Sequence, residues 1–333
     1  MADARQPGAP LNIVFATGER HYGLIANLLT RHHRLPLILV PDGDVLRQVP
    51  SHWRLKSERL RNRDLQGICQ KRGLILRTES RLEDGSLTQH LARLQADLLL
   101  VAGWPKRIAA ETLDLFRFGG LNIHPSLLPD MRGADPLFHA IDRGMTRLGV
   151  TYHLMSDELD GGDIVLQRPV TIMPSDTYDQ LYMRIRRLVR DTVLTAVELA
   201  TLATNATPQK GEPTYCTPFR HRYRVLDITA NAKAMARRSR ACFSHHPMLA
   251  SSDRAMVSFE QLQLKGRVQT SEHETGHVQA VGRNWATIQM ADHWVSLQGL
   301  LAYPSGKRHE LQEGMYLDLM STTITKLRRL ANS

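Results

Sequence analysis

The sequence predicts an α/β protein in which a doubly wound, mostly parallel sheet is followed by a small β-barrel. Over the first 200 residues, short apolar runs alternate with segments of helical periodicity. The run at 96–102 is apolar almost throughout, as expected for a parallel strand covered on both faces. Beyond residue 214 the apolar runs are short, closely spaced and separated by Gly-containing turns, a pattern typical of barrels. We therefore expect one domain at 1–204, a Pro- and Gly-containing linker at 205–214, and a second domain at 215–333.

The first domain is expected to consist of successive strand–helix units. The expected strands are 11–16, 35–40, 73–77, 96–102, 120–124, 148–155 (an alternating strand) and 164–172, and the expected helices are 21–29, 87–94, 108–116, 135–143 and 175–202. The first strand-to-helix turn holds a single glycine, Gly18, and no G-x-G-x-x-G. The dinucleotide-binding fingerprint is therefore absent, and we do not expect NAD or FAD as a cofactor.

The second domain begins with a basic helix at 227–242. Its expected strands are 255–262, 277–281, 286–290, 294–301 and 315–319. Strands of this length with tight turns close most readily into a small barrel.

Bulk properties exclude several classes of protein. No apolar run approaches the roughly 20 residues that cross a membrane, and the N-terminus lacks the apolar core of a secretory signal. The three cysteines are widely spaced and odd in number, which argues against a disulfide framework and favours a reduced, cytoplasmic setting. The formal net charge of +10 favours an anionic partner, such as nucleic acid, a phosphorylated ligand or a polyglutamate tail, over a charge that serves solubility alone.

A basic segment at 51–72 has two interpretations. It contains four arginines and a lysine before residue 64 and ends in Lys71–Arg72. It is either the solvated face of a helix or a surface that meets phosphates.

Three polar side chains end two of the expected strands. Asn122 and His124 close the strand at 120–124, and Asp160 follows the strand at 148–155 in the run Asp-Glu-Leu-Asp-Gly-Gly-Asp. An amide, an imidazole and a carboxylate at one edge of a sheet suit acyl transfer to an amine. The Asn122 and His124 N–H groups could stabilise the oxyanion, a contribution of roughly 2.7–4 kcal/mol per donor. Asp160 could orient the imidazole and relay a proton from the amine.

The complete pattern resembles the 10-formyltetrahydrofolate-dependent formyltransferases. Three motifs carry the resemblance, namely Asn-Ile-His-Pro-Ser-Leu-Leu-Pro at 122–129, Arg-Gly-Ala at 132–134 and Asp-Glu-Leu-Asp-Gly-Gly-Asp at 157–163. The resemblance implies a Rossmann-like catalytic domain in which Asn122, His124 and Asp160 are the catalytic residues. It also implies a formyltetrahydrofolate co-substrate in one-carbon metabolism, and no metal.

The resemblance also implies where the folate donor binds. Its pterin is expected between the loop at 103–108 and the loop at 155–160, largely through backbone contacts. The donor-binding residues that the resemblance implies are Gly103, Trp104, Arg107, Ile108, Ser126, Leu127, Leu128, Pro129, Met155, Asp157 and Leu159.

The acceptor is left open between two classes of amine. The layout is closest to that of the methionyl-tRNA formyltransferases, which implies an OB-like C-terminal barrel, a role in protein biosynthesis and an initiator tRNA partner met by basic surface. Two departures weigh against a tRNA acceptor: the segment at 51–72 lacks a Gly/Lys-rich run, and 242–248 lacks an Asn-Pro-Trp-Pro type of turn. The alternatives are a small-molecule amine, such as an amino sugar, hydroxyornithine or a natural-product precursor, and a non-catalytic RNA-binding protein on the same scaffold.

One further motif imitates a zinc site. His-Glu-Thr-Gly-His at 273–277 is a literal H-E-x-x-H, which binds zinc only on a helix. Here the motif contains Gly276 and precedes an expected strand, so we expect no metal.

Overall fold

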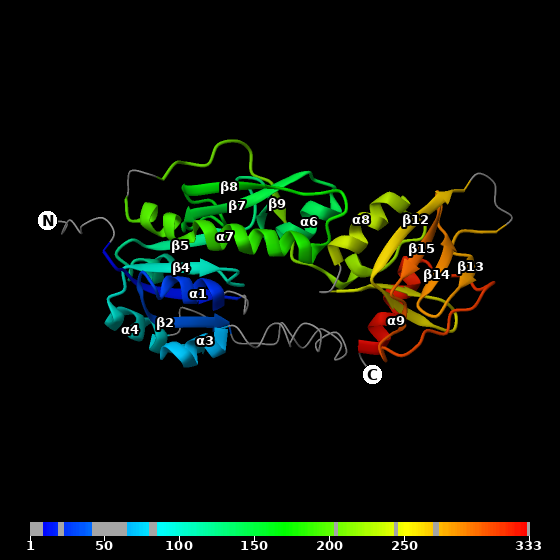
Figure 1. Cartoon of the computed structure of the whole chain (residues 1–333), viewed down its shortest axis with the longest axis horizontal. Coiled ribbons are helices and arrows are strands. Elements are labelled where there is room, and N and C mark those ends of the chain that lie inside the picture. Colours follow the sequence, from blue (N-terminus) through cyan, green and yellow to red (C-terminus); the bar gives the residue numbers. More distant parts are fainter. Residues whose placement is uncertain are drawn as a thin grey trace.

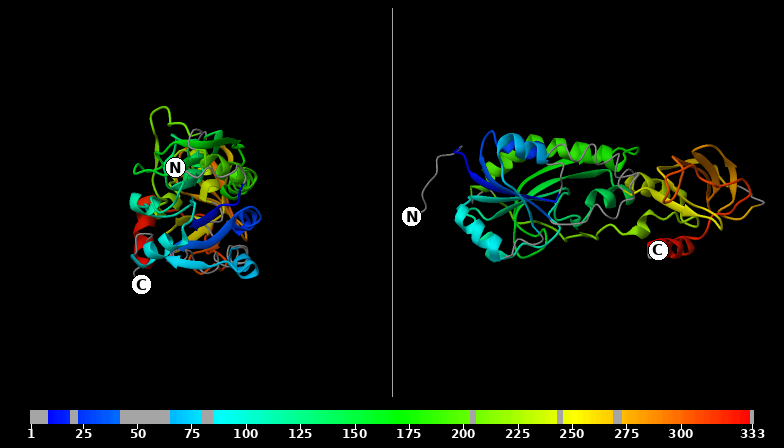
Figure 2. Two further views of the ribbon diagram at one scale, coloured as in Figure 1. Left: turned by 90° about the vertical axis from the view of Figure 1, so that its left-hand side faces the viewer. Right: turned by 90° about the horizontal axis from the view of Figure 1, so that it is seen from below.

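The computed structural model describes residues 9–18, 23–41, 65–79, 85–202, 206–242, 246–268 and 273–331. The molecule is elongated, with a large mixed sheet at one end and smaller antiparallel sheets at the other (Figures 1 and 2). Helix α8 (Ala232–Cys242) lies between these two parts.

The large sheet has the strand order β3-β2-β1-β4-β5-β7-β8. Its strands are β1 (Asn12–Thr17), β2 (Arg34–Pro41), β3 (Leu76–Glu79), β4 (Leu98–Ala102), β5 (Gly120–His124), β7 (Arg147–Leu154) and β8 (Ile164–Thr171). The first five strands in that order pair in parallel, and β7 and β8 add antiparallel to β5. The expectation of a mostly parallel sheet in an α/β protein is therefore confirmed.

Helices cover both faces of this sheet. They are α1 (Gly23–Leu29), α3 (Leu65–Arg72), α4 (Gly85–Leu94), α5 (Ala110–Leu113), α6 (Pro136–Asp142) and α7 (Tyr178–Ala200). Strand β1 shows the two-sided burial, because Ile13 and Phe15 join the core under α1 and α7 while Val14 and Ala16 join the core under α4 and α5. This is why the central strands are almost uniformly apolar in sequence.

Strand β7 is more completely buried than its alternating sequence indicates. Its residues do alternate between apolar and polar side chains, but every residue from Leu148 to His153 is buried. Tyr152 enters the main core, whereas Thr151 and His153 make hydrogen bonds on the opposite face. The alternation therefore marks a buried polar site rather than a solvent-facing side.

Some element bounds were predicted wrongly. Strand β3 begins at Leu76 rather than 73, because Gly73 adopts a left-handed φ of 63° at the end of α3 and the Leu74 N–H bonds back to the Cys69 carbonyl. Helix α5 spans four residues rather than nine. Most of the basic segment at 51–72 lies outside the described residues, and only its part in α3 is described.

The C-terminal part contains two antiparallel sheets. One has the order β10-β11-β16 (Met248–Ser251, Met256–Phe259, Leu301–Ala302), and the other has the order β12-β15-β14-β13 (Gln261–Arg267, His293–Gln298, Trp285–Gln289, Val278–Val281). Within the described ranges these two sheets do not close into one barrel. A short 3-10 helix, η2 (His221–Arg224), precedes α8.

The chain end also departs from expectation. The run at 315–319 forms only isolated bridges, Tyr316 with His277 and Leu317 with Ser252, and helix α9 (Met320–Ala331) follows it. Helix α9 is difficult to predict from the sequence, because its first half contains four consecutive β-branched residues, 322–325, which favour strands. Asp318 secures it by accepting hydrogen bonds from Ser251 Oγ and from Lys326 Nζ in the second turn.

The C-terminal part is fastened to the large sheet through α8. Arg238 on α8 forms a two-point ion pair with Asp142 at the end of α6, with nitrogen–oxygen distances of 3.0 and 2.9 Å. Apolar residues of α6, α7 and α8 share one core cluster. In the described part of the chain, no helix is both long and apolar enough to cross a membrane.

Helix α7 supplies a test of the fold. Thr177 is its N-cap and forms a capping box with Gln180, in which each side chain bonds the other residue's backbone N–H. We expect Thr177→Ala to lower the free energy of unfolding by about 1 kcal/mol, measured by urea denaturation. Thr177→Ser keeps the hydroxyl and should retain most of the stability, so an equal loss in both variants would contradict this role.

Candidate active site

The candidate site is built where β5 and β7 lie side by side. Asn122 and His124 point to the same face of β5 because they are two residues apart in a strand. Directly opposite Asn122 in the antiparallel register is His153 of β7. The Asn122 Nδ2 atom lies 3.0 Å from His153 Nε2, which links the two strands on this face.

Asp160 arrives from the loop that joins β7 to β8. Its φ of 50° is left-handed, a conformation that Asp adopts more readily than most residues. Gly162 allows the loop to fold tightly, because a Cβ atom there would lie 1.8 Å from the Leu154 carbonyl oxygen. The loop therefore turns back over β7 and directs the Asp160 side chain at the site.

The Asp160 carboxylate contacts groups from three elements. Its Oδ1 accepts a hydrogen bond of 3.2 Å from Asn122 Nδ2, and its Oδ2 accepts one of 2.8 Å from the Gly133 N–H in the short strand β6 (Arg132–Gly133). His124 Nδ1 lies 3.6 Å from Oδ2, and His153 Nε2 lies 3.5 Å from Oδ1. The Asp160 carboxylate thus lies beside Asn122 and His124, the other two catalytic side chains predicted from the sequence.

The hydrogen bonds of the two histidines define their neutral tautomers. The Met131 carbonyl lies 2.9 Å from His124 Nε2 and can only accept, so Nε2 carries the proton and Nδ1 is the basic nitrogen that faces Asp160. For His153 the Leu154 carbonyl accepts from Nδ1, which leaves Nε2 to accept from the Asn122 amide. The two imidazoles therefore have opposite tautomers, each imposed by a backbone carbonyl.

Burial and mutual contact shift the pKa values of this group. Burial lowers the pKa of the His124 imidazole below its usual value, more strongly than the nearby Asp160 charge raises it. Burial alone would raise the pKa of the Asp160 carboxyl, but close contact with His153, the proximity of His124 and the Gly133 N–H together bring that pKa to about 2. At neutral pH the site therefore holds an ionised carboxylate beside a neutral imidazole.

This arrangement can stabilise an oxyanion and move a proton. Both N–H bonds of the Asn122 amide are engaged, one with His153 and one with Asp160. The amide must exchange one of these partners to donate to a developing oxyanion. His124 Nδ1 and the Asp160 carboxylate form an acceptor pair for a proton released nearby.

Three residues that contact the site were given no role from the sequence, although Arg132 stands in the Arg-Gly-Ala motif at 132–134. His153 was treated only as part of an expected strand, although it is the one histidine of that run and precedes the carboxylate loop. Arg132, whose side chain is 5% exposed, donates from Nη1 to Glu158 and from Nη2 to Gln209 Oε1 at 2.8 Å. Gln209 lies in the expected linker and donates to the carbonyl oxygens of Asp160 and Gly162. Nothing in the composition of the linker indicated this role.

The two loops expected to hold the donor approach each other. Arg107, after β4, forms an ion pair of 2.9 Å with Asp157, although both side chains are largely exposed. Trp104 is partly buried, and in the described part of the chain its buried Nε1–H has no hydrogen-bond partner. An unpaired indole N–H at this position could bond a heterocycle. The remaining residues of these loops are Gly103, with a left-handed φ of 64°, buried Ile108, partly buried Met155 and exposed Leu159.

The Ser-Leu-Leu-Pro run at 126–129 is mainly tied to the protein itself. Ser126 is fully buried and donates its hydroxyl to the Asp130 carbonyl. The Leu128 N–H donates to Thr151 Oγ1, and the Leu128 carbonyl accepts from Gln167. Leu127 and Pro129 are partly buried, and the Leu128–Pro129 peptide bond is cis. The run forms the turn that follows β5.

The H-E-x-x-H motif is not helical, as the sequence analysis expected. Gly276 has a left-handed φ of 97°, and His277 forms a bridge with Tyr316. The rings of His273 and His277 stack at 3.7 Å between centroids. Among the described residues, no group of three His, Cys, Asp or Glu side chains is placed to share a metal ion.

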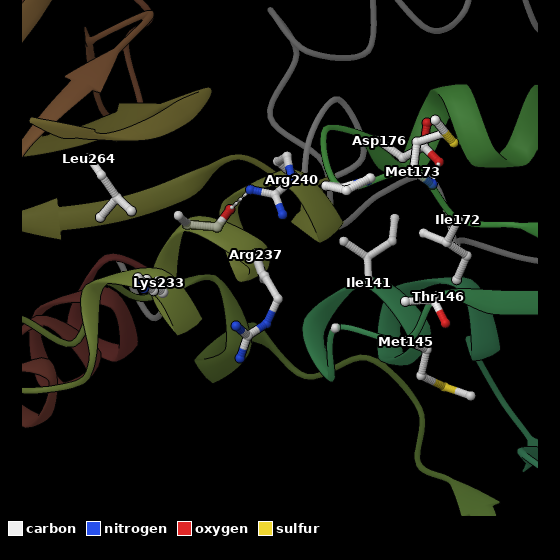
Figure 3. A pocket seen from close by; sticks show the side chains of 13 residues that line it. Ile141, Met145, Thr146, Ile172, Met173, Asp176, Lys233, Arg237, Arg240 and Leu264 are labelled. Atoms are coloured by element: carbon white, nitrogen blue, oxygen red, sulfur yellow. Dashed lines mark hydrogen bonds between the residues drawn. The ribbon is translucent and has the colours of Figure 1, made fainter.

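A cavity of about 340 Å³ lies apart from this site, between α8 and the ends of α6 and β8 (Figure 3). Lys233, Arg237 and Arg240 of α8 line one side, and apolar residues such as Ile141 and Ile172 line the other. Asn122, His124 and Asp160 are not among its lining residues.

Comparison with known proteins gave matches over most of the chain. A family model described as formyl transferase matches residues 44–197. The methionyl-tRNA formyltransferase of Chromohalobacter salexigens is 34% identical over 220 residues, which span 66% of this chain and 65% of that protein. The methionyl-tRNA formyltransferase of Aromatoleum aromaticum is 31% identical over 276 residues, 81% of each chain.

Solved structures are similar in fold. HypX from Aquifex aeolicus, crystallised with tetrahydrofolic acid, superposes with a TM-score of 0.59 at 18% identity. The superposition covers 96% of this chain and 47% of HypX. At this level of identity the match supports a common fold.

Gly162 provides a test of how the carboxylate loop is held. We expect Gly162→Ala to collide with the Leu154 carbonyl, to lower stability by roughly 1–3 kcal/mol and to move Asp160 away from His124. Urea denaturation measures the stability, and carboxyl-carbon NMR should show the Asp160 pKa rising toward its ordinary value. Gly266→Ala is the matched control, since a Cβ there meets nothing within 4 Å. Equal behaviour of the two variants would contradict the role assigned to Gly162.

Proposed function

The chain belongs to the formyl transferase family, and on that premise we propose that it transfers the formyl group of 10-formyltetrahydrofolate to the amino group of methionyl-tRNA. The observation that carries the proposal is the set of contacts around Asp160, whose carboxylate lies within 3.6 Å of both Asn122 and His124. Formyl transfer needs an oxyanion donor and a proton acceptor at one carbon atom, and these contacts provide both.

The chemistry begins with attack of the neutral amine on the formyl carbon. A carbon–nitrogen bond forms, and the electron pair of the carbonyl bond moves to oxygen. Asn122 Nδ2–H, released from one of its present partners, stabilises that oxyanion, and its loss should cost about 2.7–4 kcal/mol of transition-state stabilisation. Both N–H bonds of the Asn122 amide lie within the site, so the donor comes from the protein and becomes available when one of its two partners is released.

Proton transfer completes the reaction. The attacking nitrogen becomes cationic and gives its proton to the pair formed by Asp160 and His124 Nδ1. The intermediate then collapses, the bond from carbon to the donor nitrogen breaks, and that nitrogen takes up the proton. The products are the formylated amine and tetrahydrofolate, and Asp160 and His124 return to their initial protonation states.

The donor is proposed to bind between the loops at 103–108 and 155–160. The unpaired Trp104 Nε1–H and the ion pair of Arg107 with Asp157 support this placement, because they lie in the two loops that would enclose a pterin. The domain division at 1–204, 205–214 and 215–333 remains part of the proposal, as does an OB-like relationship for the C-terminal sheets.

The cavity beside α8 is proposed to hold phosphate groups of the tRNA. Lys233, Arg237 and Arg240 follow one another at helical spacing, and none forms an ion pair with a carboxylate among the described residues. The buried Nε–H of Arg240 has no hydrogen-bond partner there. Burial and the neighbouring Arg237 lower the pKa of the Arg240 guanidinium more than Asp176, which also lines the cavity, raises it, so a bound anion would relieve the repulsion between the two arginines.

Asp160 provides the decisive test of the chemistry. We expect Asp160→Asn to lower kcat at least 10²-fold, because the amide keeps the size of the side chain but cannot accept the proton. A formyl-transfer assay with formyltetrahydrofolate and methionyl-tRNA measures the loss, and circular dichroism checks the fold. Asp191→Asn on the exposed side of α7 is the matched control. Wild-type activity in Asp160→Asn would overturn the assignment.

The basic cavity beside α8 provides a test of the proposed tRNA acceptor. Replacing Lys233 and Arg240 together by Gln should weaken tRNA binding and reduce the slope of log K against log salt by roughly two. Filter binding across a salt series measures this slope, and Arg93→Gln on α4 serves as the control for loss of a surface charge. If tRNA does not bind at low salt and amino sugars are formylated instead, the small-molecule acceptor replaces tRNA.

A further inference from the structure

The segment that follows α7 lies against the candidate site. It leaves α7 at residue 200 and forms an antiparallel bridge between Thr207 and Ile164, at the start of β8. It then pairs as β9 (Tyr215–Cys216) with β6 in parallel. Most of this segment was predicted to be a linker. It pairs instead with the start of β8, just after the Asp160 loop, and with β6, whose Gly133 N–H bonds the Asp160 carboxylate.

We propose that this segment, 207–216, holds the catalytic groups in place, and that Gln209 is a positioning residue for Asp160. The inference rests on the proposed formyl transfer and goes beyond it, because it adds a residue from outside the family motifs. Two sets of contacts support it.

The first set acts on Asp160 through Gln209. The side-chain amide of Gln209 donates to the Asp160 carbonyl at 2.7 Å and to the Gly162 carbonyl at 2.9 Å. Both carbonyls belong to the tight turn in which Asp160 has a left-handed φ. The Gln209 amide thereby holds the one backbone conformation that aims the carboxylate at His124.

Arg132 fixes Gln209 in turn. Its guanidinium donates to Gln209 Oε1 from Nη2 at 2.8 Å and from Nε at 3.2 Å, and its Nη1 donates to Glu158 in the same loop. Arg132 is almost completely buried, so these bonds form in surroundings where an unpaired guanidinium would be costly. Gln209 accepts through Oε1 and donates through Nε2, and neither a carboxylate nor an ammonium group of similar length can do both.

The second set of contacts orients His124 through the peptide group between Met131 and Arg132. The Arg132 N–H donates to the Thr214 carbonyl at 2.8 Å, and the Met131 N–H donates to Thr214 Oγ1 at 2.8 Å. The N–H and C=O of a trans peptide point in opposite directions, so bonding the Arg132 N–H to the segment turns the Met131 carbonyl toward His124 Nε2. The next N–H, that of Gly133, bonds the Asp160 carboxylate.

One wall of the site is formed by residues 131–133, and these residues are held by the segment 207–216. β6 lies between β9 on one side and the pair His124 and Asp160 on the other. A Cβ at residue 133 would lie 2.6 Å from the Cys216 carbonyl, which shows how closely the two strands approach. The position of 207–216 therefore sets the position of the groups that hold the imidazole and the carboxylate.

Two variants of the full-length chain test the role of Gln209. Gln209→Leu removes all of its hydrogen bonds, whereas Gln209→Glu keeps an acceptor for Arg132 but turns the donors toward the two carbonyls into acceptors. We expect both variants to lower kcat about 10²-fold, the effect of a misplacement of roughly 1 Å, with KM for the folate donor nearly unchanged. Gln298→Leu and Gln298→Glu are matched controls, because Gln298 is a half-buried glutamine that bonds Ser296 in β15.

A second measurement does not depend on turnover. Carboxyl-carbon NMR of the unliganded protein should show the Asp160 pKa rising from about 2 toward its ordinary value in both Gln209 variants, and unchanged in both Gln298 variants. An unchanged Asp160 titration in Gln209→Glu, or a wild-type kcat, would overturn the proposal. If the wild-type chain transfers no formyl group, the proposed function fails, while the NMR titration still decides whether Gln209 positions Asp160.

Discussion

The buried charge of Asp160 is the constraint on which the candidate site depends. A carboxylate that is 10% exposed is stable only if its oxygens are matched by N–H groups and positive neighbours. Here the matching groups come from β5, β6 and β7, which are separate in sequence. Each of these strands must therefore keep its register for the carboxylate to remain ionised. The site therefore depends on the register of β5 and β7 in the large sheet and on the pairing of β6 with β9.

The same constraint explains the unusual backbone around the site. Asp160 and Met131 both have left-handed φ values, of 50° and 60°. Such conformations cost free energy and persist only where the surroundings determine them. The Met131 peptide is held between Thr214 and His124, and the Asp160 turn is held by Gln209. Strain at both residues serves to aim one carbonyl and one carboxylate at the same imidazole.

Prediction from the sequence succeeded where the signal was local. The uniformly apolar run of β4, the strand end at His124 and the helix after Asp135 each follow from periodicity or from proline, and the structure has them within a few residues. The parts that could not be predicted depend on contacts between distant residues. Helix α9 is rich in β-branched residues and depends on Asp318 and Lys326, while His153 and Gln209 gain their roles only when β7 and the segment 207–216 pack against the Asp160 loop.

The position of the segment 207–216 has a mechanical consequence for the whole molecule. After β9 the chain passes through η2 directly into α8, and α8 is fixed to α6 by the ion pair of Arg238 with Asp142. The Phe219 N–H also donates to Asp135 Oδ2 at the start of α6. The C-terminal part is therefore joined both to α6 and to the segment 207–216, whose contacts hold the Met131 peptide and the Asp160 turn. The basic face of α8 and the candidate active site are thus connected through α6 and the segment 207–216.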